Sequence, residues 1–206
     1  RAILHDLVIR NAKIARQDGS LLEGDLACRE GRISAISSSI PESGKEEADA
    51  KGLILMPGVI DPQVHFRDPG ASNKEDLGTG SRAAVRGGVT SFLDMPNTRP
   101  TTTTHGALEA KLQRASRICV ANYGFFIGAT PDNLDVLNTA APVCGIKIFM
   151  GASTGDLLVD KEQDLDRIFS SGSRLIAVHA EDEKRIQERM THFLGQQNSR
   201  YPPSLH

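Results

Sequence analysis

The stretch Met56-Pro57-Gly58-Val59-Ile60-Asp61-Pro62-Gln63-Val64-His65-Phe66-Arg67-Asp68-Pro69-Gly70 decides the fold and points to the chemistry. An apolar run from Leu53 to Ile60 changes abruptly into Asp, Gln, His and Arg. A buried parallel strand that delivers polar side chains to an active-site mouth has this pattern. Because side chains alternate along a strand, we expect Gln63 and His65 to point the same way, into a barrel.

Strand-like and helix-like segments alternate from this stretch onward. The strand-like segments are residues 59–65, 89–95, 119–127, 145–150 and 175–179. The helix-like segments are residues 74–86, 107–117, 133–139 and 161–170, and one that begins at about residue 182. Thr104 is a suitable N-cap and Gly87-Gly88 a suitable helix end. The alternation predicts βα units on a parallel sheet.

The number of these units sets the fold class. Residues 58–206 hold five βα units, whereas a complete TIM-type (β/α)₈ barrel needs eight units and about 250 residues. We therefore expect an α/β fold that contains the N-terminal five units of a barrel, as part of a larger whole. A self-sufficient doubly wound, flavodoxin-like sheet is the alternative.

The first part of the chain has a different character. Residues 1–57 contain strand-like segments at 6–14, 25–29, 32–36 and 52–55, whereas 41–50 is polar and rich in turn residues. Short strands with turns at this spacing indicate part of a small β-sandwich.

Composition excludes several classes of function. The formal net charge is −2 and aromatic residues make up 4% of the chain, so neither nucleic acid nor a membrane is an expected partner. Three cysteines without metal-type spacing are typical of reduced thiols, which favours a cytoplasmic protein.

The motifs resemble those of the amidohydrolase superfamily, and most closely those of the dihydroorotases. They are Pro57-Gly58-x-Ile60-Asp61, His65-x-Arg67, Met95-Pro96-Asn97-Thr98-Arg99-Pro100, Lys147 and His179. The resemblance implies a small sandwich followed by a metal-dependent barrel. It also implies hydrolase activity in pyrimidine biosynthesis, namely the reversible hydrolysis of dihydroorotate to N-carbamoyl-aspartate.

The resemblance implies one or two zinc ions held by His65, Lys147 and His179. Lys147 lies in an apolar strand, and in the family a lysine there reacts with CO₂ to form a carbamate that bridges two metals. The family normally has His-x-His where this chain has Gln63-Val64-His65, so one ligand is missing. Without the resemblance, His65 could be a core histidine, and Lys147 could lie on the outer face or in a salt bridge.

The resemblance also implies that Arg67 and Asn97 hold the substrate carboxylate. A guanidinium pairs with a carboxylate in a bidentate fork, while Asn97 could instead be a turn residue after Pro96. Glu181 could orient a ligand or cap the next helix. Asp68 replaces the usual Glu, a change to which we attach little weight. The run Gly151-Ala152-Ser153-Thr154-Gly155 is expected to be a flexible loop over the site and lacks the ending of a phosphate loop.

Two rival functions stay open. A hydantoinase or dihydropyrimidinase would share the fold, although Arg67 with Asn97 argues against it. A catalytically impaired scaffold partner of aspartate transcarbamoylase is favoured by Gln63. The catalytic residue is unknown, because the general-base Asp of the family is expected beyond residue 206. We therefore expect the chain alone to be inactive, and a C-terminal half or a homo-oligomer to complete it.

Overall fold

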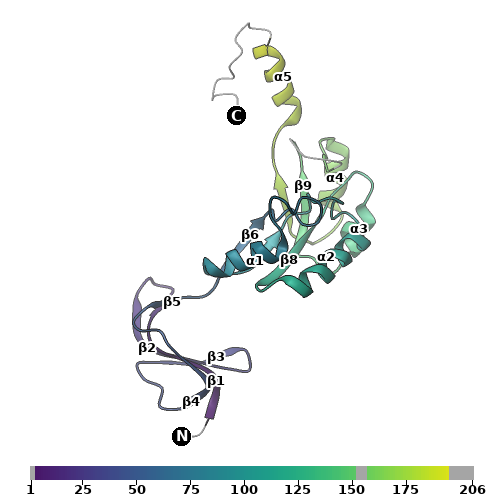
Figure 1. Ribbon diagram of the computed structural model, residues 1–206. Coiled ribbons are helices and arrows are strands. Elements are labelled where there is room, and N and C mark those ends of the chain that lie inside the picture. Colours follow the sequence, from purple (N-terminus) through teal and green to yellow (C-terminus); the bar gives the residue numbers. More distant parts are fainter. Residues whose placement is uncertain (1–2, 152–156, 195–206) are drawn as a thin grey trace. The chain divides into compact units, whose positions relative to one another are not determined.

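The computed structural model describes residues 3–151 and 157–194 (Figure 1). The chain divides into two compact units, Arg1–Pro57 and Gly58–His206. None of the helices in the part that the structure describes has both the length and the apolar character that a membrane crossing requires.

The first unit is one mixed sheet in the order β3-β2-β1-β4, in which β5 also pairs with β1. The strands β1, β2 and β3 are antiparallel neighbours, while β4 and β5 run parallel to β1. The turn from β2 to β3 is made by Glu30 and Gly31, both with positive φ, as a tight hairpin requires. The bounds are β1 (Ile3–Ala15), β2 (Leu21–Arg29), β3 (Arg32–Ser37), β4 (Ser43–Asp49) and β5 (Ile54–Leu55).

One prediction for this unit is wrong. The polar segment 41–50 contains the strand β4, although its sequence Ser-Gly-Lys-Glu-Glu-Ala-Asp shows no apolar alternation. Most of this strand is exposed, so burial contributes little to its position. Pairing with β1 and the polar contacts of Arg10 hold it instead.

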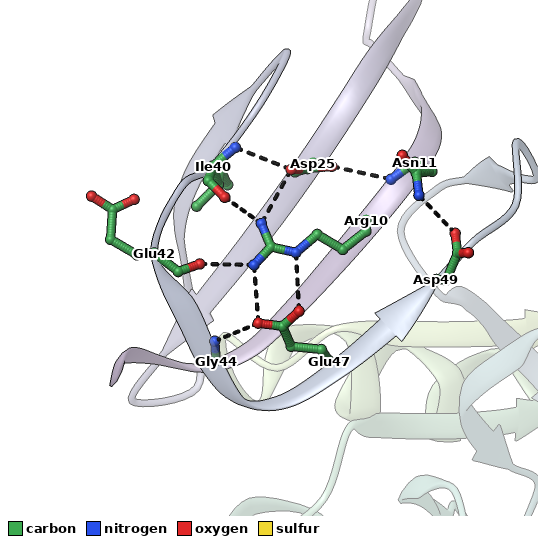
Figure 2. Close-up of polar contacts among 8 residues, drawn as sticks. All are labelled: Arg10, Asn11, Asp25, Ile40, Glu42, Gly44, Glu47 and Asp49. Atoms are coloured by element: carbon green, nitrogen blue, oxygen red, sulfur yellow. Dashed lines mark hydrogen bonds and ion pairs between the residues drawn. The ribbon is translucent and has the colours of Figure 1, made fainter. Parts of the chain in front are cut away.

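Arg10 is the centre of a polar network on the first sheet (Figure 2). Its guanidinium pairs with Asp25 at 3.3 Å and with Glu47 at 3.0 Å, and it donates to the carbonyl oxygens of Ile40 and Glu42. Asp25 also accepts from the backbone N–H groups of Asn11 and Ile40. Burial acts to raise the pKa of Asp25, but the hydrogen bonds from Ile40, Asn11 and Arg10 outweigh it and lower that pKa.

The second unit is a parallel sheet in which each strand is followed by a helix. The elements are β6 (Val59–Val64), α1 (Leu77–Arg86), β7 (Val89–Asp94), α2 (His105–Ile118), β8 (Asn122–Gly128), α3 (Leu134–Thr139), β9 (Gly145–Phe149), α4 (Glu162–Ser170), β10 (Ile176–His179) and α5 (Glu183–Leu194). The sheet order is β10-β9-β8-β7-β6, which is the order of the chain. A doubly wound sheet would reverse direction at a switch point. The predicted partial barrel is therefore confirmed, and the flavodoxin-like alternative is wrong.

Local signals in the sequence fix the helix ends. Thr104 caps α2 by accepting from the N–H of Ala107, as predicted. The helix α1 begins later than predicted, because Asp76 caps it by accepting from the N–H of Thr79 at 2.7 Å. It ends before Gly87, and the positive φ of Gly88 turns the chain toward β7.

The two faces of the sheet differ. On one face, side chains of neighbouring strands pack against α1 to α4 in a buried core. Its members include Phe92, Phe125, Ile127, Ile146 and Ile148 from the strands, and Leu77, Leu108, Leu137 and Ile168 from the helices. Alternation then places Lys147 on the opposite face, together with Phe126 and Phe149. His179, at the end of β10, lies on the same inner face as Lys147.

Candidate active site

His65 and Asn97 lie together where the first two strands of the barrel end. The Nδ1 atom of His65 is 2.7 Å from the Oδ1 atom of Asn97. An amide oxygen only accepts hydrogen bonds, so the bond requires the tautomer of His65 with the proton on Nδ1. The lone pair of Nε2 is then free to bind a metal. Metal-binding histidines are commonly oriented in this way by a second residue.

Arg67 follows in a strained backbone conformation. Its φ is 62°, a left-handed value that is uncommon for a residue with a side chain. Such strain is often found at functional sites. Among residues 3–151 and 157–194, the half-buried guanidinium of Arg67 has no hydrogen-bond or ion-pair partner. Its donors are therefore available for an anionic ligand.

The loops that carry these residues are joined to each other. The N–H of Arg99 donates to the carbonyl oxygen of Pro69 at 3.0 Å, and the N–H of Met95 donates to that of Val64 at 3.0 Å. Gly70 fits closely against Arg99, because a Cβ at Gly70 would lie 2.3 Å from the Arg99 carbonyl oxygen. The segment that follows β6 and the segment that follows β7 therefore form one packed substructure.

Lys147 lies on the inner face of β9 with a relative exposure of 3%. Its Nζ atom is 5.1 Å from the centre of the Phe149 ring. Among the described residues, no carboxylate or carbonyl oxygen pairs with this ammonium group. Burial lowers the pKa of Lys147 below its usual value. The amine is therefore easier to deprotonate than that of a solvated lysine, as carbamate formation requires.

His179 ends β10, next to the strand of Lys147. The register pairs Ala177 with Lys147, so the histidine lies one alternation farther along the same inner face. Its ring is 6.0 Å from that of Phe149. The Nε2 atom of His179 is 3.2 Å from the Oε1 atom of Glu181, which gives Glu181 a contact with the predicted ligand.

The structure thus groups the predicted residues in two sets. His65, Arg67 and Asn97 lie at the end formed by β6 and β7, and Lys147 and His179 lie on β9 and β10. The strand β8 separates the sets within the sheet. Within the described ranges, no cluster of three or more His, Cys, Asp or Glu side chains is placed to hold a metal ion.

These residues fit part of a zinc site. Two imidazoles are suitable zinc ligands, and Lys147 would add oxygen donors if its amine formed a carbamate. Gln63 is exposed, and the pairing of β6 with β7 shifts register between Asp61 and Val64. The register shift falls in the segment that contains Gln63. The oxygen of Asp61 accepts from the N–H of Gln63 at 3.0 Å, within the same strand.

Four residues near the site were not singled out as site residues in the sequence. Asp94 and Lys111 form a buried ion pair at 2.5 Å. Asp68 is 2% exposed and pairs with Arg114 at 2.8 Å. For Asp94 the available signal was a polar residue at the end of an apolar strand, whereas Lys111 and Arg114 lie within α2 and gave no such signal. The predicted loop at 151–155 falls largely on residues 152–156, which lie outside the described residues.

The profile of the amidohydrolase family matches residues 54–201. The chain belongs to the amidohydrolase family. The match covers the partial barrel and includes His65, Lys147 and His179. The resemblance to this family that the motifs indicated is therefore confirmed.

Several family members are similar over nearly the whole chain. An allantoinase of Solibacter usitatus is 37% identical over 196 residues, which is 91% of this chain and 42% of that protein. A dihydroorotase of Methanosarcina mazei is 36% identical over 185 residues, 87% of this chain and 40% of that protein. The L-hydantoinase of Arthrobacter aurescens has a TM-score of 0.85 at 29% identity, over 95% of this chain and 45% of that structure. The chain thus spans about 40 to 45% of the length of these relatives.

Proposed function

We propose that this chain supplies the metal-binding and substrate-binding part of a cyclic amidohydrolase that opens the ring of dihydroorotate. The observation that carries the proposal is Lys147, a buried amine on the same face as His179 that has no polar partner within the described part of the chain. A cation in such a place lowers stability unless it is neutralised or modified. A chemical role explains why a lysine occupies the position.

Each residue has a separate role in this proposal. His65, Lys147 and His179 would hold one or two zinc ions, which when bound activate a water molecule and polarise the amide carbonyl. The neutral amine of Lys147 attacks CO₂ and releases one proton, which leaves a carbamate with a single negative charge. Asn97 keeps the proton of His65 on Nδ1, so that the lone pair of Nε2 is free for a metal ion.

Arg67 supports dihydroorotate among the cyclic amides. Its guanidinium is without a partner in the described part of the chain and could take the substrate carboxylate in a bidentate pair. Asn97 has its amide nitrogen left over after accepting from His65, and this group could donate to the same carboxylate. The relatives named allantoinase and hydantoinase are about as similar to this chain, so the choice of substrate rests on these two side chains.

A substrate panel tests the proposal. The protein is purified with any polypeptide that accompanies it, supplied with zinc and bicarbonate, and assayed with dihydroorotate, allantoin and hydantoin. We expect the greatest kcat/KM for dihydroorotate and a loss of at least a hundredfold in Arg67→Met. Hydantoin carries no carboxylate, so any hydrolysis of it should be much less sensitive to that change. Preferential hydrolysis of allantoin or hydantoin by the unaltered protein would contradict the choice of dihydroorotate.

A second candidate is a scaffold that binds aspartate transcarbamoylase, and Gln63 favours it. An amide oxygen is a weak ligand for zinc, so the site would be impaired. Native mass spectrometry separates the two. A catalytic subunit should carry one or two zinc ions, whereas a scaffold should carry few or none and should form a complex with added transcarbamoylase.

A further inference from the structure

We propose that Asp94 is a positioning residue that holds His65 in the orientation needed for metal binding, and that Lys111 compensates the buried charge of this carboxylate. Asp94 acts through the backbone of Phe66. The inference rests on the proposed function, in which His65 is a ligand. In the described part of the chain neither side chain is hydrogen-bonded to His65, Lys147 or His179, and neither was singled out in the sequence.

Asp94 connects the end of β7 to the segment that follows β6. Its side chain is completely buried. The Oδ1 atom accepts from the backbone N–H of Phe66 at 2.9 Å. Phe66 lies between His65 and Arg67, so this bond fixes the backbone on which both side chains depend. The Oδ2 atom contacts Lys111 at 2.5 Å.

Lys111 comes from the middle of α2 and is also completely buried at its side chain. Its Nζ atom donates to the carbonyl oxygen of Met95 at 3.2 Å and lies 4.7 Å from the centre of the Phe125 ring. Met95 lies two residues before Asn97. The ion pair thus reaches the backbone beside both partners of the bond between His65 and Asn97.

Stability alone does not account for a charged pair in this place. Apolar residues of similar volume can often replace a buried ion pair without loss of stability. A charged pair offers something that an apolar pair lacks, namely a fixed acceptor for the Phe66 N–H and a fixed donor for the Met95 carbonyl. Both groups belong to the two loops that carry the site.

Helix α2 makes a second tie to the same region. Arg114 lies three residues after Lys111, on the same side of the helix. It contacts Asp68 at 2.8 Å, and Asp68 also accepts from the N–H of Leu77. One face of α2 therefore contacts both Asp68, which follows Arg67, and Asp94, which ends β7.

Two double variants with neutral side chains test the positioning role. Asp94→Asn with Lys111→Met keeps an acceptor for the Phe66 N–H, whereas Asp94→Leu with Lys111→Met removes it at a similar volume. The 206-residue chain is labelled with ¹⁵N-histidine, and the tautomer of His65 is determined by NMR at about pH 8, where an ordinary imidazole is neutral. Zinc affinity is measured by competition with a chelator.

We expect the Asn pair to keep the Nδ1–H signal of His65 and a zinc affinity within about threefold of the unaltered chain. We expect the Leu pair to lose the pure Nδ1–H signal and to bind zinc at least tenfold more weakly, the size of effect usual for residues that orient ligands. If the Leu pair fails to fold, Asp94→Ala with Lys111→Met replaces it. The smaller alanine side chain lets water reach the backbone N–H of Phe66, which has lost its acceptor.

An unchanged His65 signal in the folded Leu or Ala pair would overturn the inference. A failure of the proposed function would give a different result from a failure of the positioning role. If the His65 signal depends on the acceptor but the protein hydrolyses no cyclic amide, the positioning role stands and the assignment of the reaction falls.

Discussion

The Nδ1 atom of His65 and the Oδ1 atom of Asn97 lie 2.7 Å apart, so a predicted metal ligand and a predicted substrate-binding residue are hydrogen-bonded to each other. The bond makes the two roles dependent on one another. A change at Asn97 alters the orientation of the imidazole before any substrate is present.

Substitution of Asn97 should therefore affect metal binding. We expect Asn97→Ala to weaken zinc binding by about tenfold or more, because His65 loses the acceptor that orients it. Asn97→Asp keeps an acceptor and should bind zinc at least as tightly as the unaltered chain. Isothermal titration with zinc measures both. Equal zinc affinity in all three proteins would show that the bond does not orient the ligand.

The stability of the chain should rise with pH because of Lys147. Its lowered pKa means that the unfolded state binds more protons between that pKa and the usual value of 10.5. The free energy of unfolding therefore increases with pH in this range. The thiol of Cys144 has a pKa raised by burial to about 11, so it opposes the trend only above its usual value of 9.0.

Urea unfolding at a series of pH values up to about 10.5 in CO₂-free buffer measures this slope. Lys147→Met should remove it, whereas Lys161→Met, at an exposed lysine, should leave it unchanged. If the slope persists in Lys147→Met, another group is responsible.

Because the φ of Arg67 is positive, a glycine at this position should be more stabilising than an alanine, the reverse of the usual order. Arg67→Gly should be more stable than Arg67→Ala by about 1 kcal/mol, because glycine adopts φ of 62° without a Cβ clash. Both variants should lose affinity for dihydroorotate equally, since both lack the guanidinium. Thermal unfolding and substrate binding provide the two measurements. A more stable Arg67→Ala would mean that the backbone relaxes without cost.

Asp25 should stabilise the first unit, and its contribution should be greater at neutral pH than in acid. Asp25→Ala leaves the N–H groups of Asn11 and Ile40 without their acceptor and should lower the free energy of unfolding by about 2–3 kcal/mol. The lowered pKa of Asp25 stabilises the fold above its usual value of 3.8, and this contribution is lost as the pH falls through the folded-state pKa. The difference between the two proteins should therefore shrink in acid. Asp18→Ala, at an exposed turn, provides the control and should show a much smaller loss.

The repeating part of the fold could be predicted because burial imposes a pattern on the sequence. The strands β7 and β9 lie almost where their apolar runs predict them, and Thr104 marks the start of α2. The strand β4 could not be found in this way. Its residues are mostly exposed, and it depends on Arg10, whose partners are remote in sequence.

The candidate site could likewise be predicted only in part from the sequence. His65, Arg67 and Asn97 follow strand ends and stand in recognisable motifs. Lys111 gives no such signal, because a lysine within an amphipathic helix usually faces water. Only the packing of α2 against the sheet reveals that its charge is buried beside Asp94.

The sheet order β10-β9-β8-β7-β6 follows the chain without a crossover. A growing polypeptide can therefore assemble the site in the order of synthesis. Once α2 has left the ribosome, every group that joins His65 to Asn97 and to the Asp94–Lys111 pair is available for folding. Lys147 and His179 arrive later, on strands that each need only the preceding strand as a template. The orienting framework around His65 can thus be complete before Lys147 and His179, the other two predicted ligands, have been translated.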